Sequence, residues 1–143
     1  MASAPRRARI LVVEDDDRMR RSLQRMVTRW GYTVKSAASA EEADHLLSAD
    51  RFDICLLDIE LPRMSGLEFL TWALSRDSEM AIIMLTGVDV PDVAVECIES
   101  GARTYLVKPV EVDFLELALR DALAMRSLLI QRNDFADQLG TQS

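Results

Sequence analysis

Cysteine, histidine and lysine are all scarce in this sequence of 143 residues. The two cysteines, Cys55 and Cys97, form no C-x-x-C pair, which excludes the spacing of a zinc ribbon or a dithiol redox motif. Each lies in an apolar pattern, so we expect two buried free thiols in a reducing compartment. The single histidine, His45, falls off the apolar face of its predicted helix. We interpret it as a surface residue and not as a catalytic base.

Long apolar runs and an excess of positive charge are also missing. No stretch approaches the roughly 18 apolar residues that a membrane span requires, and residues 1–7 have no apolar core of a signal peptide. The net charge of −7 argues against a nucleic-acid surface, which needs clustered Lys and Arg. We therefore expect a cytoplasmic protein segment that binds neither a membrane nor nucleic acid.

The sequence does contain short runs of Ile, Leu and Val, separated by stretches with helical periodicity. Such runs are typical of a parallel sheet that is covered on both faces. Strands are predicted over 9–14, 32–36, 52–58, 80–85 and 103–107, and helices are predicted to begin near residues 16, 39, 67, 91 and 111. The predicted fold class is therefore α/β, with order (βα)5, a five-stranded parallel sheet and helices on both faces.

Polar residues follow four of these strands directly. They are Glu14 and Asp15 after the first strand, Asp58 after the third, Thr86 after the fourth and Lys108 after the fifth. Ligands of open α/β sheets bind beyond the carboxyl ends of the strands. We therefore expect these five residues to form one site.

The residue types in this predicted site point to phosphoryl chemistry. Three carboxylates brought together repel one another, and a hard divalent cation such as Mg²⁺ or Mn²⁺ relieves that repulsion. The Lys108 ammonium and the Thr86 hydroxyl would suit the oxygens of a phosphoryl group. Asp58 is the central carboxylate, so it is the predicted nucleophile, forming an acyl phosphate. Acids at strand ends also serve as helix caps, but that explanation fits Asp16 and not Asp58, because a Pro-containing loop follows Asp58.

Four ordered motifs carry a resemblance to a known family. They are I-L-V-V-E-D-D (10–16), L-L-D-I-E-L-P-R-M-S-G-L-E-F-L (56–70), I-I-M-L-T-G (82–87) and G-A-R-T-Y-L-V-K-P (101–109). Over residues 9–124 the chain resembles the receiver domain of two-component response regulators, which implies a flavodoxin-like receiver fold. The resemblance also implies a phosphorylation-dependent switch and not a turnover enzyme.

The resemblance assigns roles to individual residues. Asp58 would accept a phosphoryl group from a phosphohistidine of a sensor histidine kinase or a phosphotransfer protein. Asp15 and Asp58 would bind Mg²⁺ directly, Glu14 would reach it through water, and the backbone carbonyl of Glu60 would be a further ligand. Lys108 would contact the phosphoryl group. Thr86 would be the switch hydroxyl, and Tyr105 the aromatic residue that changes rotamer with it. A Lys-Pro step at this strand exit is also compatible with a cis peptide bond.

Some positions depart from the commonest pattern of that family. Glu14 replaces a more usual Asp, Val110 an aromatic residue and Gly87 an alanine. Glu60 and Val88 occupy positions that tune the lifetime of the phosphoryl group, so that lifetime is not predicted.

Three alternatives remain beside the receiver. A pseudo-receiver would bind partners without phosphorylation. A metal-dependent phosphohydrolase with an aspartyl nucleophile would need a second Asp two residues after Asp58, where Glu60 stands. A flavin-binding module would need a phosphate loop after the first strand, where the acidic run 14–17 would repel phosphate.

The two ends of the chain lie outside the resemblance. Residues 1–8 are predicted to be a disordered lead. Residues 125–143 are predicted to extend the last helix as a coiled-coil linker to an absent output domain, with a heptad pattern of Leu115, Ala118, Ala122, Met125, Leu129, Ala136 and Leu139. Up to about residue 124 this stripe is explained by packing on the sheet. A homodimer would form through this helix or through the surface of the fourth helix, fifth strand and fifth helix.

Overall fold

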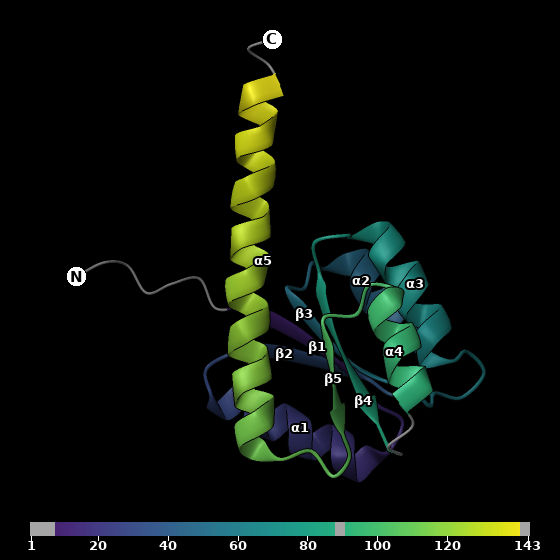
Figure 1. Cartoon of the computed structure of the whole chain (residues 1–143). Coiled ribbons are helices and arrows are strands. Elements are labelled where there is room, and N and C mark those ends of the chain that lie inside the picture. The colour runs from purple at the N-terminus through teal and green to yellow at the C-terminus, as the bar shows by residue number, and fades with distance from the viewer. Residues whose placement is uncertain (1–7, 88–90, 141–143) are drawn as a thin grey trace.

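The computed structural model describes residues 8–87 and 91–140, without the side chains of residues 91, 129, 130 and 133–140. Strands and helices alternate along the chain (Figure 1). The strands are β1 (Arg9–Val13), β2 (Thr33–Ala37), β3 (Ile54–Asp58), β4 (Ala81–Thr86) and β5 (Thr104–Val107). The helices are α1 (Asp17–Arg29), α2 (Ala40–Ala49), α3 (Gly66–Arg76), α4 (Pro91–Glu99) and α5 (Val112–Gly140).

The five strands form one parallel sheet of order β2-β1-β3-β4-β5. This confirms the predicted (βα)5 fold. Strand bounds differ from the predicted ones by up to two residues; β3, for example, begins at Ile54 and not at Phe52, although Phe52 is buried. Because β1 and β3 are neighbours, with Val13 opposite Leu57, the residues that follow them leave the sheet side by side.

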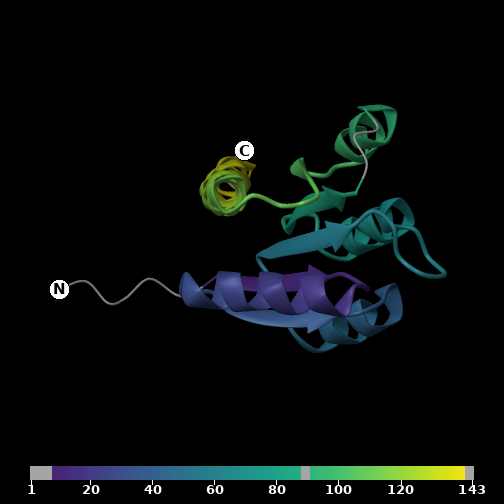
Figure 2. The same cartoon turned by 90° about the horizontal axis from the view of Figure 1, so that it is seen from below.

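Helices cover both faces of the sheet (Figure 2). Side chains of α2, α3 and α4 form one apolar core with the sheet, and side chains of α1 and α5 form the other. The three central strands are almost entirely apolar and buried, as their uninterrupted Ile, Leu and Val runs predicted. This two-sided burial holds the carboxyl ends of β1, β3 and β4 at one rigid edge.

Helix starts follow the predicted capping residues. The Asp16 side chain accepts a hydrogen bond from the backbone N–H of Met19, and the Ser39 hydroxyl accepts one from Glu42. Ser65 caps α3 in the same way, which the sequence analysis did not single out. Gly31 ends the α1 segment with φ of 97°, a left-handed conformation that favours glycine.

The last helix packs on the sheet with its first half and projects beyond it with its second half (Figure 1). Leu115 and Ala122 are fully buried, which confirms that the early part of the predicted stripe packs on the sheet. Leu128 is exposed, as expected beyond the core. The side chains of Leu129, Ala136 and Leu139 lie outside the described residues, as do residues 1–7 of the predicted lead and Val88.

A second apolar row on α5 faces outward. Phe114, Leu117 and Leu128 are 59%, 55% and 55% exposed. Together with Asp121 and Ala124, they line one side of a groove next to β5, at alternating spacings of three and four residues. We call these five residues the outer stripe of α5. The outer stripe lies one residue away from the predicted heptad positions. Leu115 and Ala122, which belong to that heptad, are buried in the core and so cannot form an exposed row.

Other expectations about single residues can be checked directly. Cys55 and Cys97 are both buried and free, and His45 is exposed. Burial raises the pKa of the Cys55 thiol far above its ordinary value, which keeps it protonated. Within the described ranges, no helix is both long and apolar enough to cross a membrane.

Candidate functional site

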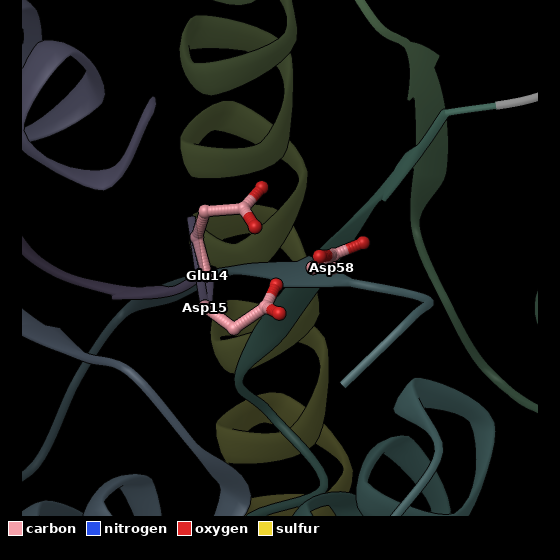
Figure 3. Close-up of side chains that lie close together, drawn as sticks. All are labelled: Glu14, Asp15 and Asp58. Carbon is pink, nitrogen blue, oxygen red and sulfur yellow. The ribbon is translucent and has the colours of Figure 1, made fainter. Parts of the chain in front are cut away.

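Three carboxylates gather at the carboxyl ends of β1 and β3. One oxygen each of Glu14, Asp15 and Asp58 lies within 4.8 Å of the others. Figure 3 shows Glu14 and Asp15 pointing from the end of β1 toward Asp58 at the end of β3. Glu14 and Asp58 are buried and Asp15 is exposed, so the cluster opens to solvent on the side of Asp15.

Lys108 joins the cluster from the loop after β5. Its Nζ lies 2.7 Å from Oε1 of Glu14 and 3.2 Å from Oδ2 of Asp58. The Lys108–Pro109 peptide bond is cis, as expected. The backbone N–H of Lys108 donates a 2.6 Å hydrogen bond to the carbonyl of Thr86, which anchors this loop to the end of β4. One ammonium therefore bridges two buried carboxylates that come from different strands.

Burial and neighbouring charges shift the pKa values of Glu14 and Lys108. Glu14 has no exposed surface, and burial together with its hydrogen bond to Asp58 raises the pKa of its carboxyl above 4.5. The Lys108 ammonium and the backbone N–H of Asp16 oppose that rise. Burial by itself lowers the pKa of Lys108, but the Glu14 and Asp58 carboxylates outweigh it and the pKa stands above 10.5. Lys108 is therefore charged at neutral pH.

Asp58 is held by its own backbone neighbourhood. The backbone N–H of Glu60 donates a 3.0 Å hydrogen bond to Oδ1 of Asp58, while Lys108 lies near Oδ2. Gly66, the first residue of α3, is pressed against this segment: a Cβ on it would lie 2.3 Å from the carbonyl oxygen of Asp58. The sequence analysis gave Gly66 no role beyond its place in the motif over 56–70. Its role in close packing was missed, because only the folded chain brings α3 against the end of β3.

Arg20 is a second residue that the sequence analysis missed. Its guanidinium donates to the backbone carbonyl of Glu14 at 3.0 Å and to that of Asp15 at 3.5 Å, and it pairs with the side chain of Asp17. Arg20, one helical turn after the Glu14–Asp15 loop, thus fixes the backbone of that loop. Its place four residues after the N-cap Asp16 was the available signal.

The remaining predicted site residues lie around this cluster. Thr86 closes β4 opposite Val107 and is 8% exposed. Tyr105 lies within β5 with 39% of its surface exposed, and among the described residues it makes no hydrogen bond to the cluster. The side chain of Glu60 is exposed, and its backbone N–H contacts Asp58. The structure therefore brings Glu14, Asp15, Asp58 and Lys108 together directly.

The charge balance of the cluster favours a cation. Three carboxylates and one ammonium leave a formal charge of −2, counted as −3 + 1. Burial is the main cause of the raised pKa of Glu14, and the charge of Asp58 adds to it. Oxygen ligands with one open, solvated side suit Mg²⁺, which keeps several waters when one or two carboxylates reach it. The residues present therefore fit a hard divalent cation.

Comparison with known families decides the membership of this chain. Residues 10–120 match the family model described as the response regulator receiver domain. The chain belongs to the response regulator receiver family. This receiver domain shares its fold with a solved receiver domain from Methanospirillum hungatei, with a TM-score of 0.81 and 32% identity over 85% of this chain and 98% of that one. The resemblance stated from the four motifs is thereby confirmed, including the flavodoxin-like fold.

Curated relatives are longer than this chain. It is 35% identical over 127 residues to the alginate biosynthesis transcriptional regulatory protein AlgB of Pseudomonas syringae pv. tomato, covering 89% of this chain and 28% of that protein. It is 36% identical to the response regulator MprA of Mycobacterium ulcerans, covering 94% of this chain and 55% of that protein. The receiver therefore spans between about a quarter and about half of these relatives.

Family membership favours the receiver over two of the alternatives. The chain is a receiver domain of two-component signalling systems, and neither a phosphohydrolase nor a flavin module is the family it matches. Receiver domains of response regulators are generally signalling domains that interact with histidine kinases. A pseudo-receiver that works without phosphorylation shares this fold and family, so it remains the competing hypothesis.

Proposed function

We propose that this receiver domain is a phosphorylation-dependent switch in which Asp58 accepts a phosphoryl group from the phosphohistidine of a histidine kinase or a phosphotransfer protein. The observation that carries the proposal is the half-buried Lys108 ammonium, which lies 3.2 Å from Oδ2 of the buried Asp58 beside two further carboxylates. A structural ion pair would need one carboxylate and not three. The excess acid is expected where a cation and a transferred anion have to bind.

The chemistry at Asp58 is a direct displacement. A carboxylate oxygen of Asp58 attacks phosphorus, a new P–O bond forms and the P–N bond to the histidine breaks, so the imidazole leaves with that electron pair and takes up a proton from solvent. Lys108 neutralises charge on the phosphoryl oxygens from the buried side. The Glu60 N–H holds the other carboxylate oxygen and so orients the attacking one. Positioning and charge neutralisation carry most of such a transfer.

Mg²⁺, or Mn²⁺ in its place, belongs to the same proposal. Asp15, Asp58 and the backbone carbonyl of Glu60 would hold the ion, and Glu14 would reach it through water. When bound, the ion supplies positive charge next to the phosphoryl oxygens. Arg20 keeps the Glu14–Asp15 loop in place by its hydrogen bonds to both carbonyls.

Phosphorylation would then switch the surface formed by α4, β5 and α5. It adds about −1.5 to −2 charges at Asp58, and the Thr86 hydroxyl and Lys108 can meet the new oxygens only by moving toward them. A shift of Thr86 makes room for Tyr105, now 39% exposed, to turn inward. Moving a two-state equilibrium from 1:99 to 99:1 needs about 5.5 kcal/mol of differential interaction, which several charge-assisted hydrogen bonds can supply.

The domain would act by changing its partners and not by turning over a substrate. The exposed residues of the switched surface include Ile98, Tyr105 and the outer stripe of α5, so a homodimer through this surface or through the C-terminal helix is part of the proposal. We propose residues 9–124 as the receiver and residues 125–143 as the helical link to an output domain. A cytoplasmic location is proposed as well, since both cysteines are free and buried.

Intact-mass spectrometry tests the proposal. Wild type, Asp58→Asn and Asp113→Asn are incubated with acetyl phosphate, with and without Mg²⁺; Asp113 is an exposed aspartate of α5 and serves as the matched control. We expect one added phosphoryl group in wild type and Asp113→Asn, only with Mg²⁺, and none in Asp58→Asn. No addition to the folded wild type with any donor would favour the pseudo-receiver.

A further inference from the structure

One ion pair joins α5 to the amino ends of the strands, at the edge of the sheet away from Asp58. Nη1 of Arg126 lies 3.2 Å from Oδ1 of Asp53, the residue just before β3. Among the side chains of α5 that the structure describes, all those after Arg126 are exposed. Arg126 therefore stands where the helix leaves the sheet (Figure 1). We call this ion pair the α5 anchor.

Asp53 is itself tied to the strands on both sides of β3. Its backbone N–H donates to the carbonyl of Arg9 at 2.8 Å, and its carbonyl accepts from the N–H of Ala81 at 3.0 Å. Its second carboxylate oxygen, Oδ2, accepts from the backbone N–H of Arg9 at 2.8 Å. Arg9 begins β1 and Ala81 begins β4. The carboxylate that Arg126 meets is therefore fixed to the centre of the sheet.

The stability of the fold does not explain the α5 anchor. The side chains of Arg126 and Asp53 are 20% and 29% exposed, and ion pairs that are open to solvent stabilise a protein only slightly. Nε of Arg126 is buried without a hydrogen-bond partner among the described residues, which costs free energy. The packed half of α5 is already held by Leu115 and Ala122, both fully buried. The ion pair thus adds a fixed point to the helix and little stability.

The place of the α5 anchor gives it a large effect on the projecting half of the helix. Ala122 is the last buried residue of α5 in the part of the chain that the structure describes, and α5 continues to Gly140. At 1.5 Å per residue, the helix after Ala122 is about 27 Å long, so a tilt of about 15° at that residue moves its far end by roughly 7 Å. Arg126 holds the helix one turn beyond Ala122 and opposes such a tilt.

We infer that the α5 anchor sets the angle between the projecting half of α5 and the sheet, so that this half moves with the sheet as one body. Arg126 is then a positioning residue for the projecting helix. The anchor lies away from the carboxylate cluster and takes no part in phosphoryl transfer. Its use by an output domain rests on the proposed helical link, whereas the angle itself can be measured in this chain.

Distances between two spin labels test this inference. The labels are attached through Ser22→Cys on α1 and Gln131→Cys on α5, both at exposed positions. Cys55 and Cys97 are buried and should stay unlabelled, which the chain without the two introduced cysteines checks. Labelled chains are diluted into an excess of unlabelled chains, so that only distances within one chain are measured by electron–electron double resonance.

The distances are compared in the wild-type background and in Arg126→Gln, Arg126→Lys and Asp53→Asn. Asn at position 53 keeps an oxygen for the N–H of Arg9 and loses the charge that Arg126 meets. Arg76→Gln is the matched control, since it breaks an ion pair with Asp44 that joins α3 to α2 and does not involve α5. The melting temperature and acetyl phosphate labelling are measured for each variant.

We expect one narrow distance distribution in the wild-type background, in Arg76→Gln and in Arg126→Lys, which keeps a cation that can reach Asp53. The distribution should widen at least twofold in Arg126→Gln and in Asp53→Asn. Because both changes remove the same ion pair, the double variant should be no wider than either single one. The melting temperatures of Arg126→Gln and Arg76→Gln should fall by similar small amounts. Acetyl phosphate should label all variants at the wild-type rate.

Three results would overturn the inference. An unchanged distribution in Arg126→Gln and Asp53→Asn would show that packing up to Ala122 alone fixes the helix. Equal widening in Arg76→Gln would show a general loosening of the fold. Widening in Arg126→Gln but not in Asp53→Asn would assign the effect to Arg126 without the ion pair. Failure of acetyl phosphate labelling in wild type would instead count against Asp58, and the distances would still decide on the α5 anchor.

Discussion

The Lys108 ammonium lies nearer to Glu14 than to Asp58, at 2.7 Å from Oε1 of Glu14 and 3.2 Å from Oδ2 of Asp58. Glu14 comes from the end of β1 and Asp58 from the end of β3, while Lys108 follows β5. The ammonium thus joins three loops that are far apart in sequence. Because both carboxylates are buried, removal of this cation would leave their repulsion unscreened.

Replacing Lys108 by methionine should destabilise the metal-free domain and tighten its binding of Mg²⁺. Loss of one partner from a buried ion pair costs about 3 kcal/mol of unfolding free energy, and the cation then faces three carboxylates without a competing ammonium. Urea denaturation measures the first effect and calorimetric titration with Mg²⁺ the second. Lys35→Met is the matched control: Lys35 pairs with Asp50 at the surface, so it should cost less than about 1 kcal/mol. Equal effects of the two replacements would contradict the bridging role.

Replacing Gly66 by alanine should damage both stability and the site. The added Cβ would lie 2.3 Å from the carbonyl oxygen of Asp58 and 2.6 Å from Cα of Ile59, so α3 or β3 has to move. Such overpacking costs about 1 to 3 kcal/mol, and Mg²⁺ affinity should fall because Asp58 shifts. Gly87→Ala is the control, since its Cβ would meet only Lys108 Cδ at 3.9 Å, an ordinary contact. If Gly66→Ala keeps the stability and the Mg²⁺ affinity of the wild type, the close contact between α3 and β3 does not constrain the geometry of the site.

The unfolding free energy should depend on pH through Glu14. Burial raises the pKa of this carboxyl above 4.5 in the folded state, so the folded chain holds the proton more tightly than the unfolded chain does. Without Mg²⁺, this contribution to stability is present below about pH 4.5 and is lost as pH rises through the folded pKa. Mg²⁺ should offset the loss on the alkaline side, by about 2.7 kcal/mol at a hundred times its Kd.

Urea denaturation over a pH series, with and without Mg²⁺, measures this dependence. Glu14→Gln removes the titrating group. It should flatten the slope of the unfolding free energy against pH between about pH 4.5 and the folded pKa of Glu14. Glu41→Gln, an exposed acid in the first turn of α2, should keep the wild-type slope. Identical slopes in wild type and Glu14→Gln would mean that another group titrates there.

Replacing Leu117 by serine should weaken a dimer that forms through the outer stripe of α5. Leu117 is 55% exposed, so serine removes no core contact and stability should stay within about 0.5 kcal/mol. Ile98→Ser on α4, 41% exposed, distinguishes the two proposed surfaces. If only Leu117→Ser lowers the sedimentation coefficient, the dimer uses α5 alone; if both do, it uses the wider surface. An unchanged coefficient in both variants would remove this surface as an interface.

Removing residues 126–143 tests the helical link separately. We expect the shortened chain to dimerise more weakly and to accept a phosphoryl group from acetyl phosphate at the wild-type rate. The carboxylate cluster lies at the carboxyl ends of the strands, whereas Arg126, where the removed segment begins, pairs with Asp53 just before the amino end of β3. Sedimentation velocity and intact mass measure the two effects. Unchanged sedimentation would argue against a coiled-coil linker.

Much of the site could be placed from the sequence because it follows from topology. In a parallel sheet every strand points the same way, so residues that end four apolar runs must share one edge. Glu14, Asp15, Asp58 and Lys108 were located by that reasoning alone, and the structure brings all four together. The local signals of capping at Asp16 and Ser39 were equally direct, since they depend on contacts within one helical turn.

Close contacts between distant segments were decided only by the tertiary structure. The sequence could not show that Gly66 meets the backbone of Asp58, or that Lys108 lies closer to Glu14 than to Asp58, because these distances depend on how α3 and the β5–α5 loop pack. On α5, the sequence predicted one apolar row, the heptad through Leu115, and the exposed row one residue away from it was found only in the structure. Only packing on the sheet determined that Leu115 is buried while Phe114 and Leu117 remain exposed. Residue order along strands and helices thus determined the fold and the membership of the site, and side-chain packing determined its geometry and the exposed surfaces.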